Sequence, residues 1–166
     1  MIAFKPANAD DWAVIRHIAY TTWPDTFGHI ITADQLDYML NLIYNEESIR
    51  SQMSEKGHHY LLATLQEDPI GFVSYEIHFN SQPQLMIHKF YLLPEFQGVG
   101  IGTKALNLLS EIARKNGDKL LRLKVYYKNA KAIGFYERYG FRNAGSEETN
   151  IGNNYNILDN VMVKEV

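Results

Sequence analysis

The sequence contains no cysteine, and this absence excludes several kinds of chemistry at once. Disulfide bonds, thiolate metal sites and cysteine nucleophiles are all ruled out. A chain that does without disulfides suits a reducing compartment, so we expect a cytoplasmic protein.

The chain also lacks long apolar runs and a strong excess of one charge. No segment approaches the roughly 20 apolar residues that cross a bilayer, and the first residues do not resemble a signal peptide. We therefore expect an unprocessed, soluble protein with no membrane partner. The net charge is −3, whereas nucleic-acid-binding domains usually concentrate basic residues, so we expect no nucleic acid partner.

The composition favours a single folded domain. Hydrophobic residues make up 46% of the 166 residues and charged residues 21%, which is ordinary for a globular protein and argues against disorder. A chain of this length buries roughly 70% of its unfolded surface around one core. We see no linker and no repeat, and we expect one domain over residues 1–166.

The spacing of apolar residues predicts a mixed α/β (α+β) fold. Strands are expected at residues 2–5, 59–65, 70–79, 84–93 and 121–125, from Phe141 onward, and at 155–163; helices are expected from Asn8 or Asp10, at 32–43, 45–53, 103–115 and 129–139. Residues 21–31 are rich in aromatic and turn residues, and irregular structure is predicted there. Short turns between the middle strands imply an antiparallel meander. The whole pattern predicts a mixed, mostly antiparallel sheet flanked by helices.

A glycine-rich loop, Gln97 to Thr103, lies between an apolar run and an amphipathic run. Alternate glycines let the backbone approach a ligand closely, and a helix that follows presents free N–H groups to an anion. The loop does not fit the dinucleotide fingerprint, because Thr103 stands where the third glycine belongs. It does not fit a P-loop either, because Lys104 comes one position late.

The loop resembles the acyl-CoA signature of the GNAT superfamily of N-acetyltransferases, Q/R-x-x-G-x-G/A, through Gln97, Gly100 and Gly102. A second block, from Asn129 to Phe141, resembles the family element N-x-x-A-x-x-F/L-Y-x-x-x-G-F. The two blocks occur in the order and at the spacing of the family. The resemblance implies the GNAT fold, with acetyl-CoA as the acetyl donor.

The resemblance also implies which residues bind the donor. In the family, the strand before the loop pairs with pantetheine amides, the loop holds the pyrophosphate, and a tyrosine in the second block protonates the leaving thiolate. This tyrosine corresponds to Tyr136, and the asparagine that hydrogen-bonds pantetheine corresponds to Asn129. The implied cofactor-binding residues are Phe90, Tyr91, Leu92, Gln97, Gly98, Val99, Gly100, Ile101, Gly102, Thr103, Asn129, Ala132 and Tyr136.

The proton of the acceptor amine needs a base, because a free alkyl amine is mostly protonated at neutral pH. His88 and Glu76 are the two candidates. Strand alternation puts His88 on the same face as Phe90, near the expected thioester. His58 and His59 are adjacent in a strand and face opposite ways, so they make a poor metal pair and no metal is expected.

The acceptor is expected to be a primary amine of a small molecule, such as a polyamine, or of a peptide N-terminus. Trp23, Phe27 and His29 occupy the place where the superfamily builds its acceptor wall, although the two aromatic residues would also suit a hydrophobic plug between helices. A non-catalytic acyl-CoA-binding module is the alternative function. The resemblance leaves a homodimer open.

Overall fold

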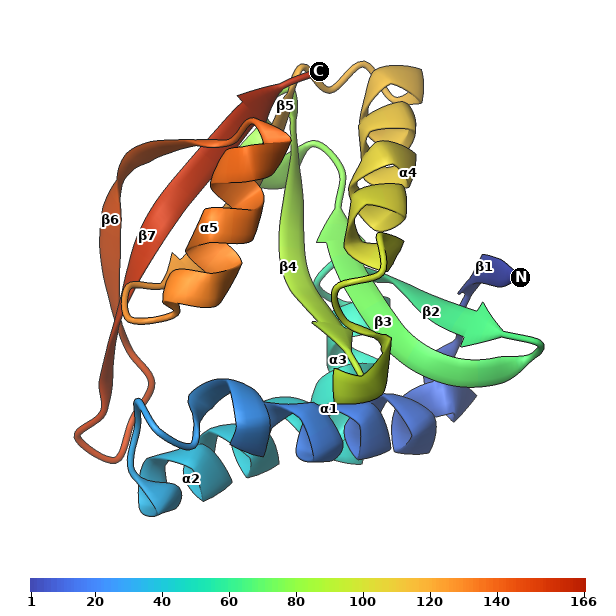
Figure 1. Cartoon of the computed structure of the whole chain (residues 1–166). Coiled ribbons are helices and arrows are strands. Elements are labelled where there is room, and N and C mark those ends of the chain that lie inside the picture. Colours follow the sequence, from blue (N-terminus) through green and yellow to red (C-terminus); the bar gives the residue numbers. More distant parts are fainter. The chain divides into compact units, whose positions relative to one another are not determined.

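The computed structural model describes all 166 residues of the chain. Its contacts divide the chain into two compact units: Met1–Glu76 with His88–Leu108, and Ile77–Ile87 with Leu109–Val166. Figure 1 labels the helices and strands of both. Each unit combines strands with helices, in agreement with the predicted fold class.

The first unit is built on an antiparallel meander. Its elements are β1 (Ile2–Pro6), the 3-10 helix η1 (Ala9–Asp11), α1 (Trp12–Phe27), α2 (Ala33–Tyr44), α3 (Glu46–Ser54), β2 (His59–Leu65), β3 (Asp68–Glu76), the second part of β4 (Gln84–Leu92), the 3-10 helix η3 (Pro94–Phe96) and the start of α4 (Ile101–Lys115). The strand order is β1-β2-β3-β4, and β2 runs antiparallel to both β1 and β3. The predicted meander is confirmed.

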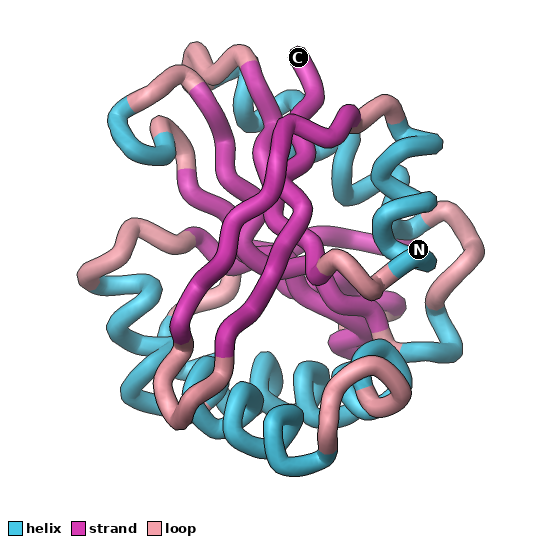
Figure 2. The backbone as a smooth tube through the Cα atoms, turned by 90° about the vertical axis from the view of Figure 1, so that its left-hand side faces the viewer, coloured by secondary structure: helices cyan, strands magenta, loops and turns pink.

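The second unit adds a parallel pair and a long hairpin. It holds the first part of β4, the 3-10 helix η2 (Phe79–Ser81), the rest of α4, β5 (Leu120–Tyr126), α5 (Ala130–Tyr139), β6 (Arg142–Asn150) and β7 (Asn156–Glu165). The strand order is β4-β5-β7-β6; β4 and β5 are parallel, whereas β7 is antiparallel to β5 and to β6. Figure 2 shows β6 and β7 as a long two-stranded ribbon. The mixed, mostly antiparallel sheet is therefore as predicted.

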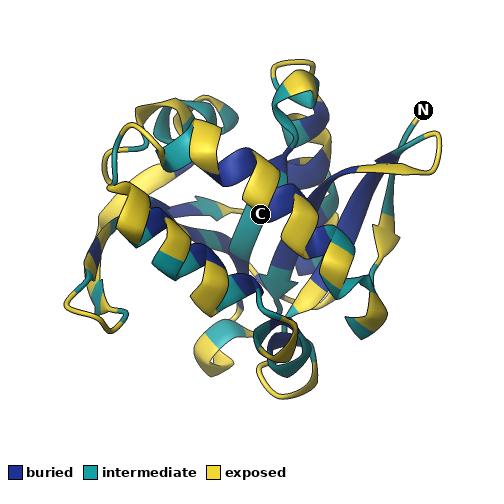
Figure 3. Cartoon of the chain, turned by 90° about the horizontal axis from the view of Figure 1, so that it is seen from below, coloured by how far each residue is buried: buried dark blue, intermediate teal, exposed yellow.

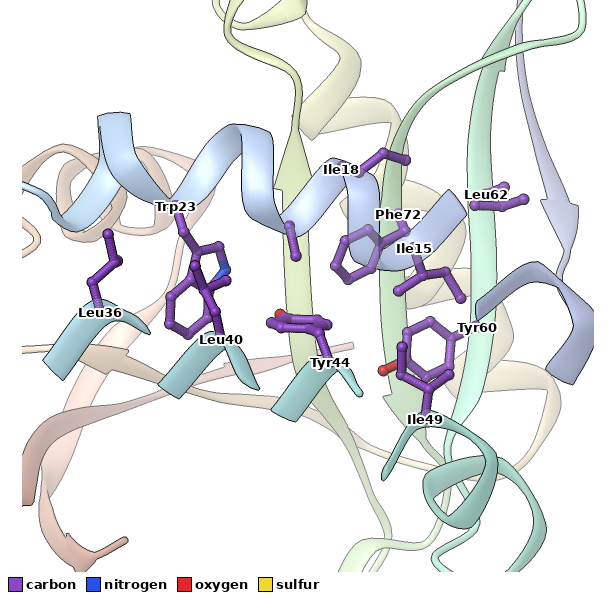
Figure 4. Packing of buried hydrophobic residues seen from close by; sticks show 11 residues of the cluster. Ile15, Ile18, Trp23, Leu36, Leu40, Tyr44, Ile49, Tyr60, Leu62 and Phe72 are labelled. Carbon is purple, nitrogen blue, oxygen red and sulfur yellow. The ribbon is translucent and has the colours of Figure 1, made fainter. Parts of the chain in front are cut away.

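The core of the first unit lies between its helices and its strands. Figure 4 shows Trp23 pointing from α1 toward Leu40 and Tyr44 of α2, with Phe72 of β3 close by. The other buried members of this cluster are Ile15, Ile18, Ala19, Leu36, Ile49, Tyr60 and Leu62. The helices carry exposed and buried stretches in alternation in Figure 3, as amphipathic helices do. No helix is both long enough and apolar enough to span a membrane.

The prediction of irregular structure over residues 21–31 is wrong for residues 21–27, because α1 continues to Phe27 with Pro24 inside it, and it is confirmed for residues 28–31, which form turns and a bend. Proline has no backbone N–H, so the carbonyl oxygen of Tyr20, one turn earlier, loses its usual helical donor. Trp23 is 3% exposed and packs into the core. Tertiary burial of this ring therefore outweighs the weak local preference for helix.

The turn between β2 and β3 also lies earlier than expected. Gln66 and Glu67 have positive φ angles of 49° and 75° and form the turn, whereas Asp68 and Pro69 already belong to β3. Pro69 pairs with Thr64 at a register shift in β2. A strand tolerates proline at such an irregularity, because a ladder hydrogen bond is missing there in any case.

Candidate active site

The glycine-rich loop connects the end of β4 to the start of α4. The side-chain Nε2 of Gln97 donates to the carbonyl oxygen of Leu92 at 3.0 Å and ties the loop to the strand. Gly98 and Gly100 have φ angles of 79° and 87°, which other residues adopt only with strain. A Cβ atom at either glycine would meet nothing within 4 Å, so the loop backbone is open to a ligand.

Some of the remaining loop residues pack against the strand, whereas others are exposed to solvent. Ile101 is 4% exposed and packs with Leu92, which holds the first turn of α4 against the strand. Val99 is 69% exposed. Gly102 and Thr103 lie in the first turn of α4, where backbone N–H groups have no partner within the helix. This arrangement suits an anionic ligand such as a pyrophosphate.

The end of β4 lies unusually close to β3, at Gly71. A Cβ atom at Gly71 would come within 2.6 Å of the carbonyl oxygen of Tyr91 and 2.5 Å of the side chain of Leu92. The N–H of Leu93 donates to the carbonyl oxygen of Ile70 at 2.8 Å. Sequence reasoning missed Gly71, although a glycine inside an apolar strand is a known sign of close backbone approach.

Phe90 and Tyr91 pack against different hydrophobic clusters. Phe90 packs with Ile70, Leu92 and Ile101, whereas the ring of Tyr91 lies 5.7 Å from Trp23 and 5.8 Å from Phe72. The structure therefore brings a residue of the predicted acceptor wall next to a residue of the predicted cofactor strand.

The three predicted wall residues differ in their exposure. Trp23 is almost fully buried, and its ring lies 4.8 Å from that of Phe27. Phe27 is half-buried at the last position of α1, and His29 is exposed beyond the end of the helix. Trp23 thus belongs to the core, whereas Phe27 and His29 present surface to solvent.

The two candidate bases are in direct contact. Nε2 of His88 lies 3.0 Å from Oε1 of Glu76. The ring of His58 stacks on the ring of His88, with centroids 3.8 Å apart and planes 14° from parallel, and Nε2 of His58 lies 3.9 Å from the same carboxylate oxygen. Sequence reasoning considered His58 only together with His59, because no local signal places a residue just before β2 beside the end of β3.

Burial shifts the pKa values of His58 and Glu76. Desolvation, followed by the nearby His88 and Lys89, lowers the pKa of His58 to about 3, so its ring is neutral at neutral pH. Desolvation raises the pKa of Glu76, and His59 opposes this in part.

Lys89, the next residue on β4, joins a buried polar network. Its Nζ donates to Oε1 of Gln52 at 2.9 Å, and the hydroxyl of Tyr60 donates to the same oxygen at 2.5 Å. The amide of Gln52 is oriented by donating to the carbonyl oxygen of Ile43 and to Ser48. Burial lowers the pKa of Lys89 to about 7 and raises the pKa of Tyr60. The network fixes β4 against α3 beside His88, and sequence reasoning did not find it.

In the second unit, Asn129 and Tyr136 lie on α5 and its cap. Oδ1 of Asn129 accepts from the N–H of Ala132 at 3.3 Å, which caps the helix and leaves the Nδ2 group without a protein partner. The ring of Tyr136 lies 5.3 Å from Phe135 and 5.5 Å from Phe141. Burial raises the pKa of Tyr136 to about 12, so its hydroxyl keeps its proton at neutral pH.

A solved structure shares this fold over the full chain. It is the PaiA N-acetyltransferase of Thermoplasma acidophilum in complex with coenzyme A, with a TM-score of 0.81 over 100% of this chain and 99% of that one. The identity is 23%, so the likeness shows the fold alone.

Two curated relatives match shorter segments. An uncharacterized N-acetyltransferase of Methanocaldococcus jannaschii is 38% identical over 44% of this chain and 34% of its own length. The spermine/spermidine N(1)-acetyltransferase of Bacillus subtilis is 29% identical over 60% of this chain and 64% of its own length. The matches thus span between a third and two thirds of these relatives.

The family model described as the acetyltransferase (GNAT) family matches residues 12–141, which is most of the chain. The matched region includes the glycine-rich loop, the His88–Glu76 pair and the second block that ends at Phe141. The chain therefore belongs to the GNAT acetyltransferase family.

Proposed function

We propose that the chain acts as one catalytic domain that transfers the acetyl group of acetyl-CoA directly to a primary amine. The observation that carries this proposal is the contact between His88 and Glu76. His88 lies two residues before Phe90 on β4, the strand that leads into the glycine-rich loop. An imidazole held by a carboxylate is a common arrangement for a general base. The complex of the Thermoplasma acidophilum relative with coenzyme A supports the choice of donor.

The proposed donor site uses backbone groups more than side chains. The pyrophosphate would accept hydrogen bonds from the N–H groups of residues 98–103, at the positive end of the α4 dipole. Pantetheine would pair with the backbone of residues 90–92, and an N–H near Tyr91 would polarise the thioester carbonyl as an oxyanion hole does. Asn129 has a free Nδ2 group that can donate to a pantetheine oxygen.

In the proposed reaction, His88 removes a proton from the acceptor ammonium group, and the neutral nitrogen attacks the thioester carbon. The tetrahedral intermediate then collapses, the C–S bond breaks, and the second proton of the nitrogen leaves. One proton reaches the sulfur and one reaches solvent, so that the products are the acetylated amine and coenzyme A. The reaction needs no covalent enzyme intermediate.

Tyr136 is the proposed donor to the leaving sulfur. A thiol has an ordinary pKa near 8.5, so complete proton transfer from a phenol with a pKa of about 12 is unfavourable. We therefore assign Tyr136 the task of donating a hydrogen bond to the developing thiolate while the proton released by the amine reaches the sulfur.

For the acceptor, we propose a small polyamine, with a peptide N-terminus as the other class. The Bacillus subtilis relative that carries the name of a spermine/spermidine acetyltransferase supports the first class. Of the three predicted wall residues, Phe27 and His29 are the ones that solvent reaches, so they are the ones that an acceptor could contact.

The test measures thiol release and the mass of the product with acetyl-CoA and a panel of polyamines, amino acids and short peptides. His88→Ala should lower kcat/KM by about a hundredfold or more on the best amine. His17→Ala is the matched control, because His17 is exposed on α1 and lies outside the His88–Glu76 contact, and it should retain most of the activity. A chain that binds acetyl-CoA and acetylates no amine would instead be a non-catalytic binding module.

A further inference from the structure

We propose that His58, Glu76 and His88 form a binding site for a divalent ion of the zinc class, and that the bound ion switches the enzyme off. The ligand atoms that the three side chains offer all lie within 4.8 Å of one another. Two imidazoles and one carboxylate form an established zinc ligand set that leaves a fourth position for water. Sequence analysis expected no metal because it paired His58 only with His59.

The spacing of the ligand atoms fits a small ion. Zinc bonds of about 2.0–2.1 Å in a tetrahedron place ligand atoms roughly 3.3–3.4 Å apart. The distances from Oε1 of Glu76 to Nε2 of His88 and to Nε2 of His58 are 3.0 and 3.9 Å, one on either side of this value. Binding requires the two imidazole planes to open from their 14° stack so that both lone pairs converge, which side-chain rotation provides.

The fold holds His58 in place without a hydrogen bond to its ring. Its Nδ1 is buried and has no partner, and its Nε2 is beyond hydrogen-bond distance from Glu76. Its position is set by stacking on His88 and by the backbone N–H, which donates to the carbonyl oxygen of Gln52 at 2.9 Å. An imidazole kept beside a carboxylate with no hydrogen bond of its own is free to ligate an ion.

A second histidine–carboxylate pair in the chain shows what a purely structural contact looks like. Nδ1 of His78 lies 2.9 Å from Asp118, and the N–H of His78 donates to the other oxygen of the same carboxylate at 3.1 Å. This pair has two members and no third ligand. The His58 cluster differs because three side chains from three separate segments meet at one oxygen atom.

The ligand types restrict the ion. Imidazole nitrogens suit zinc, copper, nickel and cobalt, whereas magnesium and calcium prefer a set of oxygen ligands. Zinc is therefore the ion to test, with cobalt as its coloured substitute.

The switch itself rests on the proposed function. In the metal-free chain Nε2 of His88 donates to Glu76, so the lone pair that would accept the proton of the acceptor amine is on Nδ1. An ion at Nε2 displaces that proton, and the neutral imidazole then carries its one proton on Nδ1, where it can no longer accept another. The metal-free chain is then the active form, and the metal-bound chain is inactive until a chelator removes the ion.

The first test measures binding and does not involve activity. The chelator-treated chain is titrated with zinc chloride by calorimetry and with cobalt chloride by visible absorption, which intensifies in a tetrahedral site. We expect one ion per chain, at least about tenfold weaker binding in His58→Gln, and unchanged binding in the control His17→Gln, at an exposed histidine of α1. Thermal unfolding checks that both variants fold. Absence of the cobalt band, or equal affinity in His58→Gln and the natural chain, would overturn the site.

The second test measures inhibition by following the acetylated amine rather than the thiol, because zinc also binds free coenzyme A. For each protein, the rate with zinc is compared with the rate of the same protein without metal. Zinc should inhibit the natural chain, a chelator should restore the rate, and His58→Gln should need at least about tenfold more zinc. Inhibition of His58→Gln at the same zinc concentration would overturn the switch. A chain that binds one ion but acetylates no amine would contradict the proposed function and leave the metal site standing.

Discussion

Nε2 of His88 lies 3.0 Å from Oε1 of Glu76, which joins a residue of β4 to the last residue of β3. In the proposed reaction this contact orients the imidazole and stabilises its protonated form.

Replacing the carboxylate tests this role. Glu76→Gln keeps an oxygen near His88 but removes the negative charge, so kcat/KM should fall about tenfold, less than in His88→Ala. The double variant should be no slower than His88→Ala alone, because Glu76 acts through His88. The test is the steady-state kcat/KM of the three variants. If the losses in kcat/KM of the two single variants add up in the double variant, the two residues act independently.

Tyr136→Phe removes the hydroxyl proposed to stabilise the leaving thiolate. The rate of acetyl transfer should fall about a hundredfold, whereas acetyl-CoA affinity should change little because the ring remains. Calorimetric binding and single-turnover kinetics separate these two effects. Tyr127→Phe, at an exposed tyrosine, is the control, and equal rates in the two variants would remove Tyr136 from the mechanism.

Gly71→Ala tests the close approach of β3 and β4. The added Cβ would press on the carbonyl oxygen of Tyr91 and on Leu92, and overpacking of this kind typically destabilises by about 1–3 kcal/mol. The KM for acetyl-CoA should rise as well, because the displaced backbone is the proposed pantetheine site.

Gly134→Ala is the matched control for this substitution. In α5 the new Cβ would meet only the far end of the Arg138 side chain, at 3.1 Å, and alanine favours a helix over glycine. Urea unfolding should show this variant to be as stable as the natural chain or more stable. An equally stable Gly71→Ala with normal KM would contradict the proposed constraint.

The shifted pKa of Asp159 makes the free energy of unfolding of the chain depend on pH. Desolvation, and the nearby carboxylate of Glu147, raise its pKa, while Lys124 opposes them. The folded state therefore holds this proton more tightly than the unfolded state, and the stability that this gives is lost as the pH rises through the folded pKa.

Asp159→Asn should stabilise the chain at pH 7 by less than about 1 kcal/mol, since solvent screens a partly exposed charge. At a pH below the ordinary pKa of the group, both states of the natural chain are protonated and the gain should shrink. Urea unfolding at the two pH values measures this difference. Glu148→Gln serves as the control, because Glu148 pairs with Leu158 rather than with an acid.

Local signals in the sequence were enough for most of the fold. Thr32, Asn45 and Asn129 each accept a hydrogen bond from a backbone N–H of the helix that follows, as their residue types predict. The glycines of the loop after β4 were recognised because positive φ angles and open backbone are properties of the residue itself. Two motifs at the right spacing were sufficient to indicate the family, which the match over residues 12–141 confirms.

Only the tertiary structure decided which side chains meet. The register that pairs His59 with Tyr75 places His58 beside Glu76, and no periodicity within β2 or β3 reveals that pairing. The helix through Trp23 and the clearance at Gly71 likewise depend on contacts with residues far away in the chain. Helix caps and turns arise from neighbours a few residues apart, whereas the clustering of His58, Glu76 and His88 and the shape of the strand end arise from long-range packing, which local sequence does not encode.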